Sequence, residues 1–210
     1  MRTLYINTTG KTLEICFKDN EQYHHYTSTN QKSQSEEIID AIATTLHNAT
    51  ISDIDLIITN IGPGSFTGIR LGLSVIKGFQ LATKVRIIPI DNFFALYLSQ
   101  RNRTPAPYNI ALDASGNDYY FATLDENGTP TTAYTLLKKD ELKETTSPII
   151  SDFLKGDNIL PAKILPEEII KFYETTPNLN KYIKEELNAL YIKPHYAKTK
   201  QHPQNKTLAL

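Results

Sequence analysis

The chain has 210 residues, 40% of them hydrophobic, and its 22 basic and 23 acidic side chains give a formal net charge of −1. This length allows one compact domain or two small lobes, and the near-neutral charge gives no electrostatic reason to expect the chain alone to bind nucleic acid or a membrane tightly. With no apolar run of roughly 20 residues, no signal-peptide pattern and a single cysteine, Cys16, a cytoplasmic protein without disulfides is expected.

Three strand-like segments open the chain and a helix follows them. The strands are expected at residues 2–7, 12–20 and 22–28. Ser33 and Glu36 then stand at the spacing of a capping box, in which two side chains satisfy backbone N–H groups at a helix start. Four apolar residues after them recur at helical spacing: Ile38, Ile39, Ile42 and Leu46. The pattern predicts an amphipathic helix that begins near Ser35.

Two apolar strands, each followed by a helix, complete the first half. The strands are expected at residues 55–61 and 86–90, and the second is followed by a helix over residues 91–102. Strands that are apolar almost throughout are typical of parallel sheets with helices on both faces. The sequence TPAP at residues 104–107 is the best linker because proline breaks both helices and sheet ladders. We therefore divide the chain into lobes 1–103 and 104–210.

The opening pattern recurs after this linker. Residues 108–128 read as a strand, a turn of small residues and a returning strand that ends at an Asn-Gly hairpin turn. Asn7 and Asp113 then occupy equivalent strand ends with an offset of 106 residues, and Gly10 and Gly116 follow them with the same offset. The match suggests that the two halves are related.

The remainder of the second half is less regular. Helices are expected from Pro166 and over residues 178–190. The polar segment at residues 197–210 is expected to be a frayed tail.

A glycine-rich turn begins at Gly62, in the sequence GPGSFTGIRLGLSVIKGFQLA. It joins the apolar strand at residues 55–61 to the helix that follows, which runs to about Thr83. A nucleotide-binding P-loop would need Lys and Ser/Thr after its last glycine, but Ile69 and Arg70 follow Gly68, so this alternative is rejected.

A dinucleotide-binding turn is a second alternative. The spacing of Gly62, Gly64 and Gly68 is one residue longer than the usual fingerprint, and Asp91 ends the next strand where an acid could bind a ribose. Against this alternative, Pro63 removes one of the backbone donors that such a turn directs at a pyrophosphate.

Close packing is the third alternative. Gly68 and Gly72 lie one helical turn apart, so a neighbouring backbone can approach that flank. The flank continues with Val75, Ile76 and Phe79, and a helix that is apolar over most of its circumference is buried on more than one side. It is either a purely internal helix or, as we favour, a surface for a partner. Gly72→Leu is then expected to prevent partner binding without unfolding the chain.

Other catalytic patterns are weak. Ser65 does not stand in a G-x-S-x-G motif. His24 and His25 are adjacent in a strand and would point to opposite faces, and the other histidines are isolated: His47, His195 and His202. Cys16 fits a small packing residue. Asp113 could hold a metal-nucleotide or accept backbone N–H groups in its own turn, and we prefer the second alternative.

These segments together resemble the bacterial TsaB family, an accessory subunit of the tRNA threonylcarbamoyladenosine machinery. The glycine turn and its helix resemble the family signature, and looser matches occur in LYINTT, QSEEIIDAI, ALDA with YY, and LNALYIKPHYAK. The resemblance covers nearly the whole chain. It implies an actin-like, Hsp70-type ATPase fold (ASKHA, RNase H-like) with two related lobes of mixed sheets flanked by helices.

The resemblance also implies a role. Proteins of this kind are non-catalytic scaffolds that bind and activate a TsaD-like catalytic subunit, with a TsaE-like ATPase, for transfer of threonylcarbamoyl to the adenosine beside the anticodon of ANN-decoding tRNAs. It implies tRNA contact through the complex, a homodimer when the chain is alone, and ATP/ADP and Mg only in the complex. The implied interface is Ser35, Ile38, Ile39, Ile42, Gly68, Gly72, Val75, Ile76 and Phe79. Asn7 and Asp113 would mark the edge of a nucleotide site.

The chain departs from the family pattern at three positions. Asn7 stands where the family usually has Asp, Gln34 where it commonly has His, and Ser115 where it often has Arg. The loss of the carboxylate at Asn7 weakens a claim of nucleotide binding by this chain. The alternative function is a nucleotide-dependent enzyme, either a sugar-kinase-like phosphotransferase or an NAD-dependent oxidoreductase that uses the turn from Gly62 to Gly68.

Overall fold

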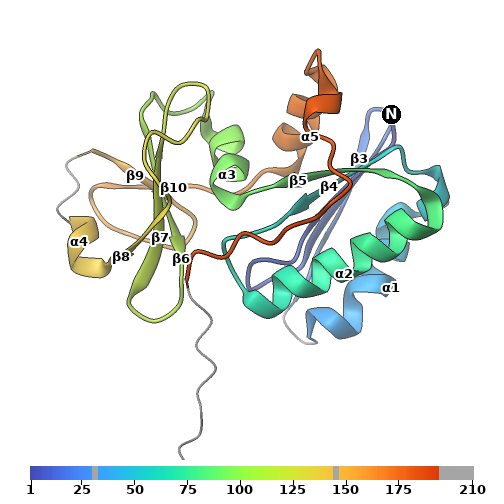
Figure 1. Cartoon of the computed structure of the whole chain (residues 1–210), viewed down its shortest axis with the longest axis horizontal. Coiled ribbons are helices and arrows are strands. Elements are labelled where there is room, and N and C mark those ends of the chain that lie inside the picture. Colours follow the sequence, from blue (N-terminus) through green and yellow to red (C-terminus); the bar gives the residue numbers. More distant parts are fainter. Residues whose placement is uncertain (30–32, 144–146, 194–210) are drawn as a thin grey trace, which may run out of the picture.

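Two lobes, each built on a five-stranded mixed sheet, form the protein (Figure 1). The computed structural model describes residues 1–29, 33–143 and 147–193. The first sheet has the order β3-β2-β1-β4-β5, and its strands are β1 (Thr3–Asn7), β2 (Glu14–Asp19), β3 (Gln22–Thr27), β4 (Leu56–Asn60) and β5 (Arg86–Ile90). β1 pairs antiparallel with β2 and parallel with β4.

The second sheet repeats this arrangement. It has the order β10-β9-β6-β7-β8, and its strands are β6 (Tyr108–Asp113), β7 (Asp118–Leu124), β8 (Thr135–Lys138), β9 (Ile149–Ser151) and β10 (Ile159–Pro161). β6 pairs antiparallel with β7 and parallel with β9, as β1 does with β2 and β4. The predicted relation between the two halves is therefore visible in the pairing of the strands.

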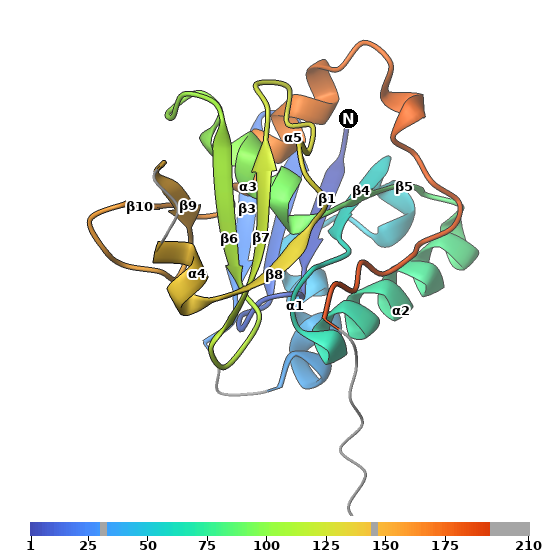
Figure 2. The same ribbon diagram turned by 60° about the vertical axis from the view of Figure 1, so that its left-hand side comes forward.

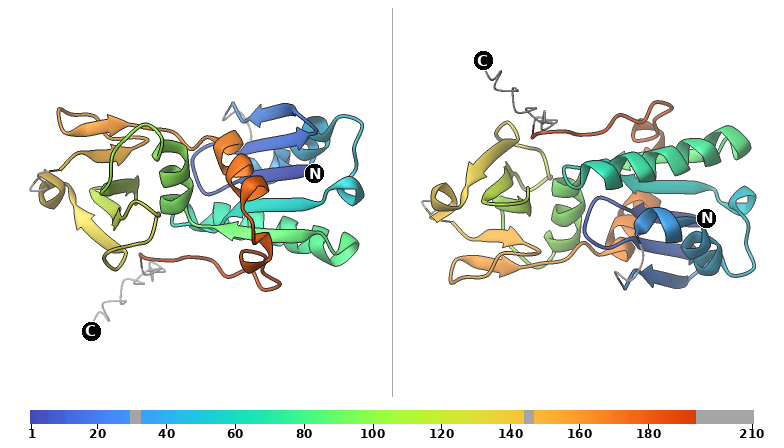
Figure 3. Two further views of the ribbon diagram at one scale, coloured as in Figure 1. Left: turned by 90° about the horizontal axis from the view of Figure 1, so that it is seen from above. Right: turned by 90° about the horizontal axis from the view of Figure 1, so that it is seen from below.

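Helices cover both faces of the first sheet. α1 (Gln34–Leu46) and α2 (Phe66–Thr83) lie side by side on one face, whereas α3 (Asn92–Gln100) and α5 (Pro166–Thr175) lie on the other, toward the second lobe (Figures 1 and 3). α3 lies between the two sheets (Figure 2). The short elements are η1 (Ile51–Asp53), α4 (Lys139–Lys143) and η2 (Leu179–Lys181).

The helix starts agree with their sequence signals. The capping box predicted at α1 is present, and the Ser33 N–H donates to Glu36 Oε2 over 2.8 Å. Ser65 caps α2, where its Oγ accepts the Gly68 N–H over 3.1 Å. Such side chains satisfy donors that have no partner inside a helix, and they fix where both helices begin.

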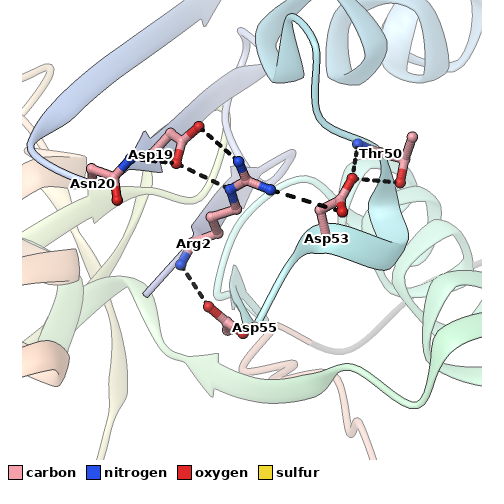
Figure 4. Close-up of polar contacts among 6 residues, drawn as sticks. All are labelled: Arg2, Asp19, Asn20, Thr50, Asp53 and Asp55. Atoms are coloured by element: carbon pink, nitrogen blue, oxygen red, sulfur yellow. Dashed lines mark hydrogen bonds and ion pairs between the residues drawn. The ribbon is translucent and has the colours of Figure 1, made fainter.

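Polar contacts around Arg2 hold one end of the first sheet together (Figure 4). Arg2 Nε donates to Asp19 Oδ1 over 3.0 Å, and Arg2 Nη1 lies 3.8 Å from Asp53 Oδ1. The Arg2 N–H donates to Asp55 Oδ2 over 2.8 Å. Two hydrogen bonds from Thr50 lower the pKa of Asp53. The start of β1 is thus tied to the β2–β3 turn and to η1.

One apolar core runs through both lobes. It joins Tyr5 and Ile58 of the first sheet to Ile110 and Tyr120 of the second, with Phe93 of α3 between them. A second core lies between α1, α2 and the opposite face of the first sheet. The lobes therefore share buried surface instead of meeting across an open cleft.

The helix predicted over residues 178–190 is wrong. Only η2 forms there, and an extended segment then runs back over the first lobe (Figure 1). The Lys184 N–H donates to Ile87 O over 2.9 Å, and the Leu190 N–H donates to Ile61 O over 2.8 Å. Bonds to the edge of the first sheet replace the bonds that a helix would have made.

The predictions for the tail and for two histidines fall on residues that the structure does not describe. Residues 197–210, together with His195 and His202, lie outside them. Within the described parts of the chain, every helix is too short or too polar to cross a bilayer.

Candidate functional site

The glycine turn between β4 and α2 is closed by contacts within the chain. Gly62 has a φ of 113° and precedes a cis peptide bond to Pro63. A Cβ on Gly62 would lie 2.5 Å from Leu190 O, so this position requires glycine. The Ser65 N–H donates to Thr9 O over 2.7 Å. Two donors that a dinucleotide turn would aim at phosphate, those of Ser65 and Gly68, are thus bonded to acceptors of the chain itself.

The Asp91 side chain caps the start of α3, so it is not placed as a ribose-binding acid. Its carboxylate accepts the Phe94 N–H over 2.8 Å as the helix cap. Burial raises the pKa of Asp91, and the cap hydrogen bonds oppose this shift. The acid that the oxidoreductase alternative required is therefore committed to the fold.

The flank of α2 that carries Gly68 and Gly72 packs against the turn after β1. A Cβ at Gly68 would overlap the Thr8 carbonyl, and one at Gly72 would overlap Thr8 Oγ1. Thr8 Oγ1 also donates to Gly68 O over 2.7 Å. The prediction that a second polypeptide contacts this flank is wrong, because the chain's own turn covers it. The expectation that Gly72→Leu leaves the fold intact is wrong for the same reason.

Three of the predicted interface isoleucines belong to the core. Ile38, Ile42 and Ile76 lie between the helices and the first sheet and are at most 2% exposed. Their assignment to a partner surface is corrected, since helical periodicity places them on the face that covers the sheet. The remaining predicted positions keep some exposure: Ser35 and Ile39 are exposed, and Val75 and Phe79 are half-buried.

The exposed side of the two helices lies beside the glycine flank. We define the outer helical face as Ser35, Ile39 and Ala43 of α1 with Leu71, Ser74, Val75 and Gly78 of α2. Ile39 is 56% exposed, and a Cβ at Gly78 would have no atom within 4 Å. None of these seven residues is charged, although other exposed residues of the same helices are: Glu36, Asp40, Arg70 and Lys77. Reasoning from the sequence missed Leu71, Ser74 and Gly78, although their spacing matched that of Val75.

Asn7 and Asp113 each close the turn that follows their strand. Asn7 Oδ1 accepts the Thr9 N–H over 3.0 Å, and Asp113 Oδ1 accepts the Ser115 N–H over 2.8 Å. The preferred alternative for Asp113, a bond to backbone in its own turn, is confirmed. Lys11 Nζ lies 3.5 Å from Asp113 Oδ2, so the two turns face each other across the lobes.

The Glu14 carboxylate beside the first turn is partly buried. Asn7 Nδ2 donates to Glu14 Oε2 over 3.2 Å. Burial raises the pKa of Glu14, and this hydrogen bond opposes the shift. Gln34 Nε2 donates to Gly10 O over 3.1 Å, so the departure at Gln34 ties α1 to the first turn.

The predictions for His24, His25 and Cys16 agree with the structure, but His47 was expected to be isolated and instead lies with its ring centre 4.4 Å from that of His24. The His24 ring contacts those of Phe17 and His47, whereas His25 Nε2 lies 3.0 Å from Glu167 Oε1. Adjacent histidines thus point to opposite faces. Cys16 is buried, and burial raises the pKa of its thiol to about 12. Within residues 1–29, 33–143 and 147–193, no three His, Cys, Asp or Glu side chains are grouped to hold a metal ion.

Comparison with known families places much of this chain in one of them. The family model described as TsaD, tRNA N6-adenosine threonylcarbamoyltransferase, matches residues 25–149. The tRNA threonylcarbamoyladenosine biosynthesis protein TsaB of Haemophilus influenzae is 25% identical over 122 residues, which are 57% of this chain and 52% of that protein. TsaB of Escherichia coli is 23% identical over 133 residues, 61% of this chain and 58% of that protein. The chain spans little more than half the length of these two relatives.

Solved structures agree on the fold. An uncharacterised Pseudomonas aeruginosa protein, described as similar to the peptidase YEAZ, superposes with a TM-score of 0.73 and 12% identity over 91% of this chain and 99% of its own. YeaZ from P. aeruginosa gives a TM-score of 0.71 and 14% identity with the same coverage. The predicted fold class, an actin-like and RNase H-like α/β fold of two related lobes, is confirmed.

Proposed function

Because the chain belongs to the TsaD family, tRNA N6-adenosine threonylcarbamoyltransferase, and is TsaB-like and YeaZ-like within it, we propose that it acts in tRNA threonylcarbamoyladenosine biosynthesis. Its proposed role is that of a non-catalytic scaffold. It binds a TsaD-like catalytic subunit, joins a TsaE-like ATPase and meets tRNA through the assembly. Alone, it forms a homodimer through the same surface.

The polar residues of the two turns support a scaffold over an enzyme. The Asn7 amide is bonded to Thr9 and Glu14, and the Asp113 carboxylate is bonded to the Ser115 N–H and faces Lys11. Active relatives of a kinase-like fold need a carboxylate from each lobe to hold metal and nucleotide. Here the first lobe offers an amide, and both side chains already serve their own turns. For the ATPase-type site at these two turns, bound ATP or ADP with Mg is proposed only in the complex with the partner subunit.

The outer helical face carries the proposed contact with the catalytic subunit. It is uncharged, Ile39 is 56% exposed on it, and Leu71 and Val75 add partly exposed apolar area. Gly78 allows a partner to approach the helix backbone closely. A stable contact of standard size buries about 800 Å² per partner, which two neighbouring helices can supply. Binding activates the partner if the face has higher affinity for its competent conformation.

Gly78→Leu tests this proposal. The position has open space above it, so the leucine is tolerated by the fold but blocks close approach of the partner. The variant is mixed with the TsaD-like protein of the same organism and analysed by gel filtration and by a tRNA threonylcarbamoylation assay. We expect loss of co-elution and of modification, with no fall in Tm.

Lys77→Leu is the matched control. Lys77 is exposed and adjacent in sequence but lies outside the outer helical face. We expect it to co-elute with the partner like the wild type. If Gly78→Leu retains both the complex and the modification activity, the outer helical face does not bind the catalytic subunit.

A further inference from the structure

A hollow of about 460 Å³ lies at the C-terminal end of α3. It is on the side of the first sheet opposite the outer helical face, because α3 and α5 cover that side (Figure 3). The side chains that carry the argument are Tyr97, Arg101, Asn102, Tyr108, Phe172 and Tyr182. They come from α3 and the residues after it, from β6, from α5 and from the segment after η2. Several parts of the chain thus converge on one place.

Two aromatic rings at this hollow stand between two cations, one of which, Lys181, lies just outside its lining. The Arg101 guanidinium carbon lies 4.8 Å from the centre of the Phe172 ring. The Phe172 and Tyr182 rings meet nearly at right angles with centres 6.2 Å apart. Lys181 Nζ then lies 4.6 Å from the centre of the Tyr182 ring. Two positive charges therefore flank two rings that are both partly exposed.

The hydroxyl groups of Tyr97 and Tyr108 have partners, whereas one nitrogen of the Arg101 side chain has none. Tyr97 Oη donates to Glu126 O over 2.8 Å, and Tyr108 Oη donates to Arg101 O over 3.2 Å. Arg101 Nε is buried and meets no acceptor among the described residues. A buried donor of this kind is costly unless something accepts its hydrogen bond. Glu126 and Asn127 complete the rim, where both side chains are exposed.

We propose that this hollow binds a nucleotide. Aromatic side chains stack on bases of any sequence, and a guanidinium fork matches the geometry of a phosphate. The amides of Asn102 and Asn127 offer donors and acceptors for the edge of a base. The volume falls within the range of small-ligand sites. A purely apolar ligand would not use the two positive charges beside the rings.

Two sources of ligand share this chemistry, a free mononucleotide and an unpaired nucleotide of an RNA. The inference is independent of the proposed function, because the hollow and the outer helical face lie on opposite sides of the first sheet. Gly78→Leu is therefore expected to leave nucleotide binding unchanged even where it abolishes the contact with the catalytic subunit.

Calorimetric titration of the full-length chain tests the proposal in two arms. One arm uses AMP, and the other uses a single-stranded adenosine hexamer, both at low salt. We expect saturable binding of one ligand per chain. Arg101→Met is expected to weaken binding at least about tenfold, since it removes a charge-assisted hydrogen bond. Phe172→Leu is expected to weaken it by a similar factor through lost stacking.

Arg103→Met is the matched control. Arg103 is exposed and lies two residues beyond Arg101 but does not line the hollow. We expect it to bind like the wild type. Asn102→Ala, at an exposed position that does line the hollow, is expected to weaken binding about threefold, and it decides the matter if circular dichroism shows that Arg101→Met is unfolded.

The two arms separate the sources of the ligand. Equal affinity for AMP and the hexamer assigns the site to a free nucleotide. An affinity for the hexamer that is at least about tenfold higher and falls with salt assigns it to RNA. If neither ligand binds saturably, or if Arg101→Met and Asn102→Ala both bind like the wild type, the proposal is overturned.

Discussion

Asn7 shows how a single residue at a strand end can stabilise the turn that follows it. Its Oδ1 accepts hydrogen bonds from the N–H and the hydroxyl of Thr9, while its Nδ2 donates to Glu14. An amide accepts at one atom and donates at the other, whereas a carboxylate only accepts. Because burial raises the pKa of Glu14, the neutral amide is the side chain that this carboxylate tolerates as a neighbour. An asparagine at position 7 can donate a hydrogen bond to Glu14, which the aspartate common in the family could not do.

Asn7→Asp is expected to lower stability at pH 7 by about 1–3 kcal/mol, since it replaces a buried donor with a second carboxylate. Repulsion raises the pKa of both acids in the folded state. A raised carboxyl pKa favours folding when the group is protonated, so stability falls as the pH rises through the window above the ordinary value of 4.5. Urea unfolding at pH 4.5 and 7 measures the effect.

Glu14→Gln, added to the Asn7→Asp variant, provides the control for this prediction. The glutamine amide can donate to the new aspartate, so the double variant should recover most of the stability at pH 7. Equal stability of Asn7→Asp and the wild type at both pH values would contradict the account of this turn.

Lys18 and Glu174 form an ion pair that joins β2 to α5. Lys18 Nζ lies 2.6 Å from Glu174 Oε2, and the two side chains are 10% and 17% exposed. Glu174→Gln is expected to lower the free energy of unfolding by about 1.5–3 kcal/mol, because Lys18 keeps its charge in a nearly buried place. Chemical unfolding measures it. Glu21→Gln is the control, since Glu21 is 97% exposed at 4.0 Å from Lys18 Nζ and should change stability little.

The pH dependence of this pair has a defined sign. The hydrogen bond with Glu174 raises the pKa of Lys18 above its ordinary value of 10.5. The stability that the pair contributes is therefore complete below pH 10.5 and is lost as the pH rises through the folded-state pKa. The difference between the wild type and Glu174→Gln should narrow above pH 10.5, and a difference that stays constant there would argue against the ion pair.

Secondary-structure elements differ in how well local sequence determines them. The start of α1 followed from Ser33 and Glu36, because a capping box acts over one helical turn. Residues 184–190 instead bond to the edge and end of the first sheet, a partner distant in sequence. Their helical pattern therefore misled the prediction, and no local signal could have corrected it.

The sequence predicted which two helices carry the candidate site, but it did not predict which residues of those helices are exposed. The bare flank at Gly68 indicated close packing correctly, yet periodicity does not say whether the neighbour is Thr8 of the same chain or another protein. The outer helical face lies beside that flank and contains Gly78. The hollow at Arg101 was not predicted, since its residues are scattered along the chain and meet only in three dimensions.

Two glycines of α2 should respond oppositely to the same substitution. Gly68→Ala is expected to destabilise by about 1–3 kcal/mol, because the new Cβ overlaps the rigid Thr8 carbonyl. Gly78→Ala is expected to stabilise by about 0.5–1 kcal/mol, because its methyl group meets no atom and alanine favours the helix. Thermal unfolding of the two variants measures both effects. Similar changes of the same sign would show that Thr8 does not confine this flank.

At the scale of the whole molecule, α3 and the segment after η2 help to hold the lobes together. α3 contributes Phe93 and Leu96 to a core shared by both sheets. The segment after η2 is bonded to the first lobe through Leu190, and Lys193 Nζ reaches the second lobe at Asp118 Oδ2 over 2.8 Å. Such shared burial makes separate opening of either lobe costly. A rigid pair of lobes suits a scaffold that presents a fixed helical surface.

Leu96→Ala tests whether the lobes unfold as one unit. Leu96 is fully buried in α3 between the sheets, so its truncation should cost about 2–5 kcal/mol. If the core is continuous, hydrogen exchange measured by mass spectrometry should accelerate equally in β1, β4 and β6, since all exchange through the same global unfolding. Surface variant Arg103→Met is the control and should accelerate none of them. Acceleration confined to β6 would mean that the second lobe opens by itself, and the rigidity that the scaffold role requires would be lost.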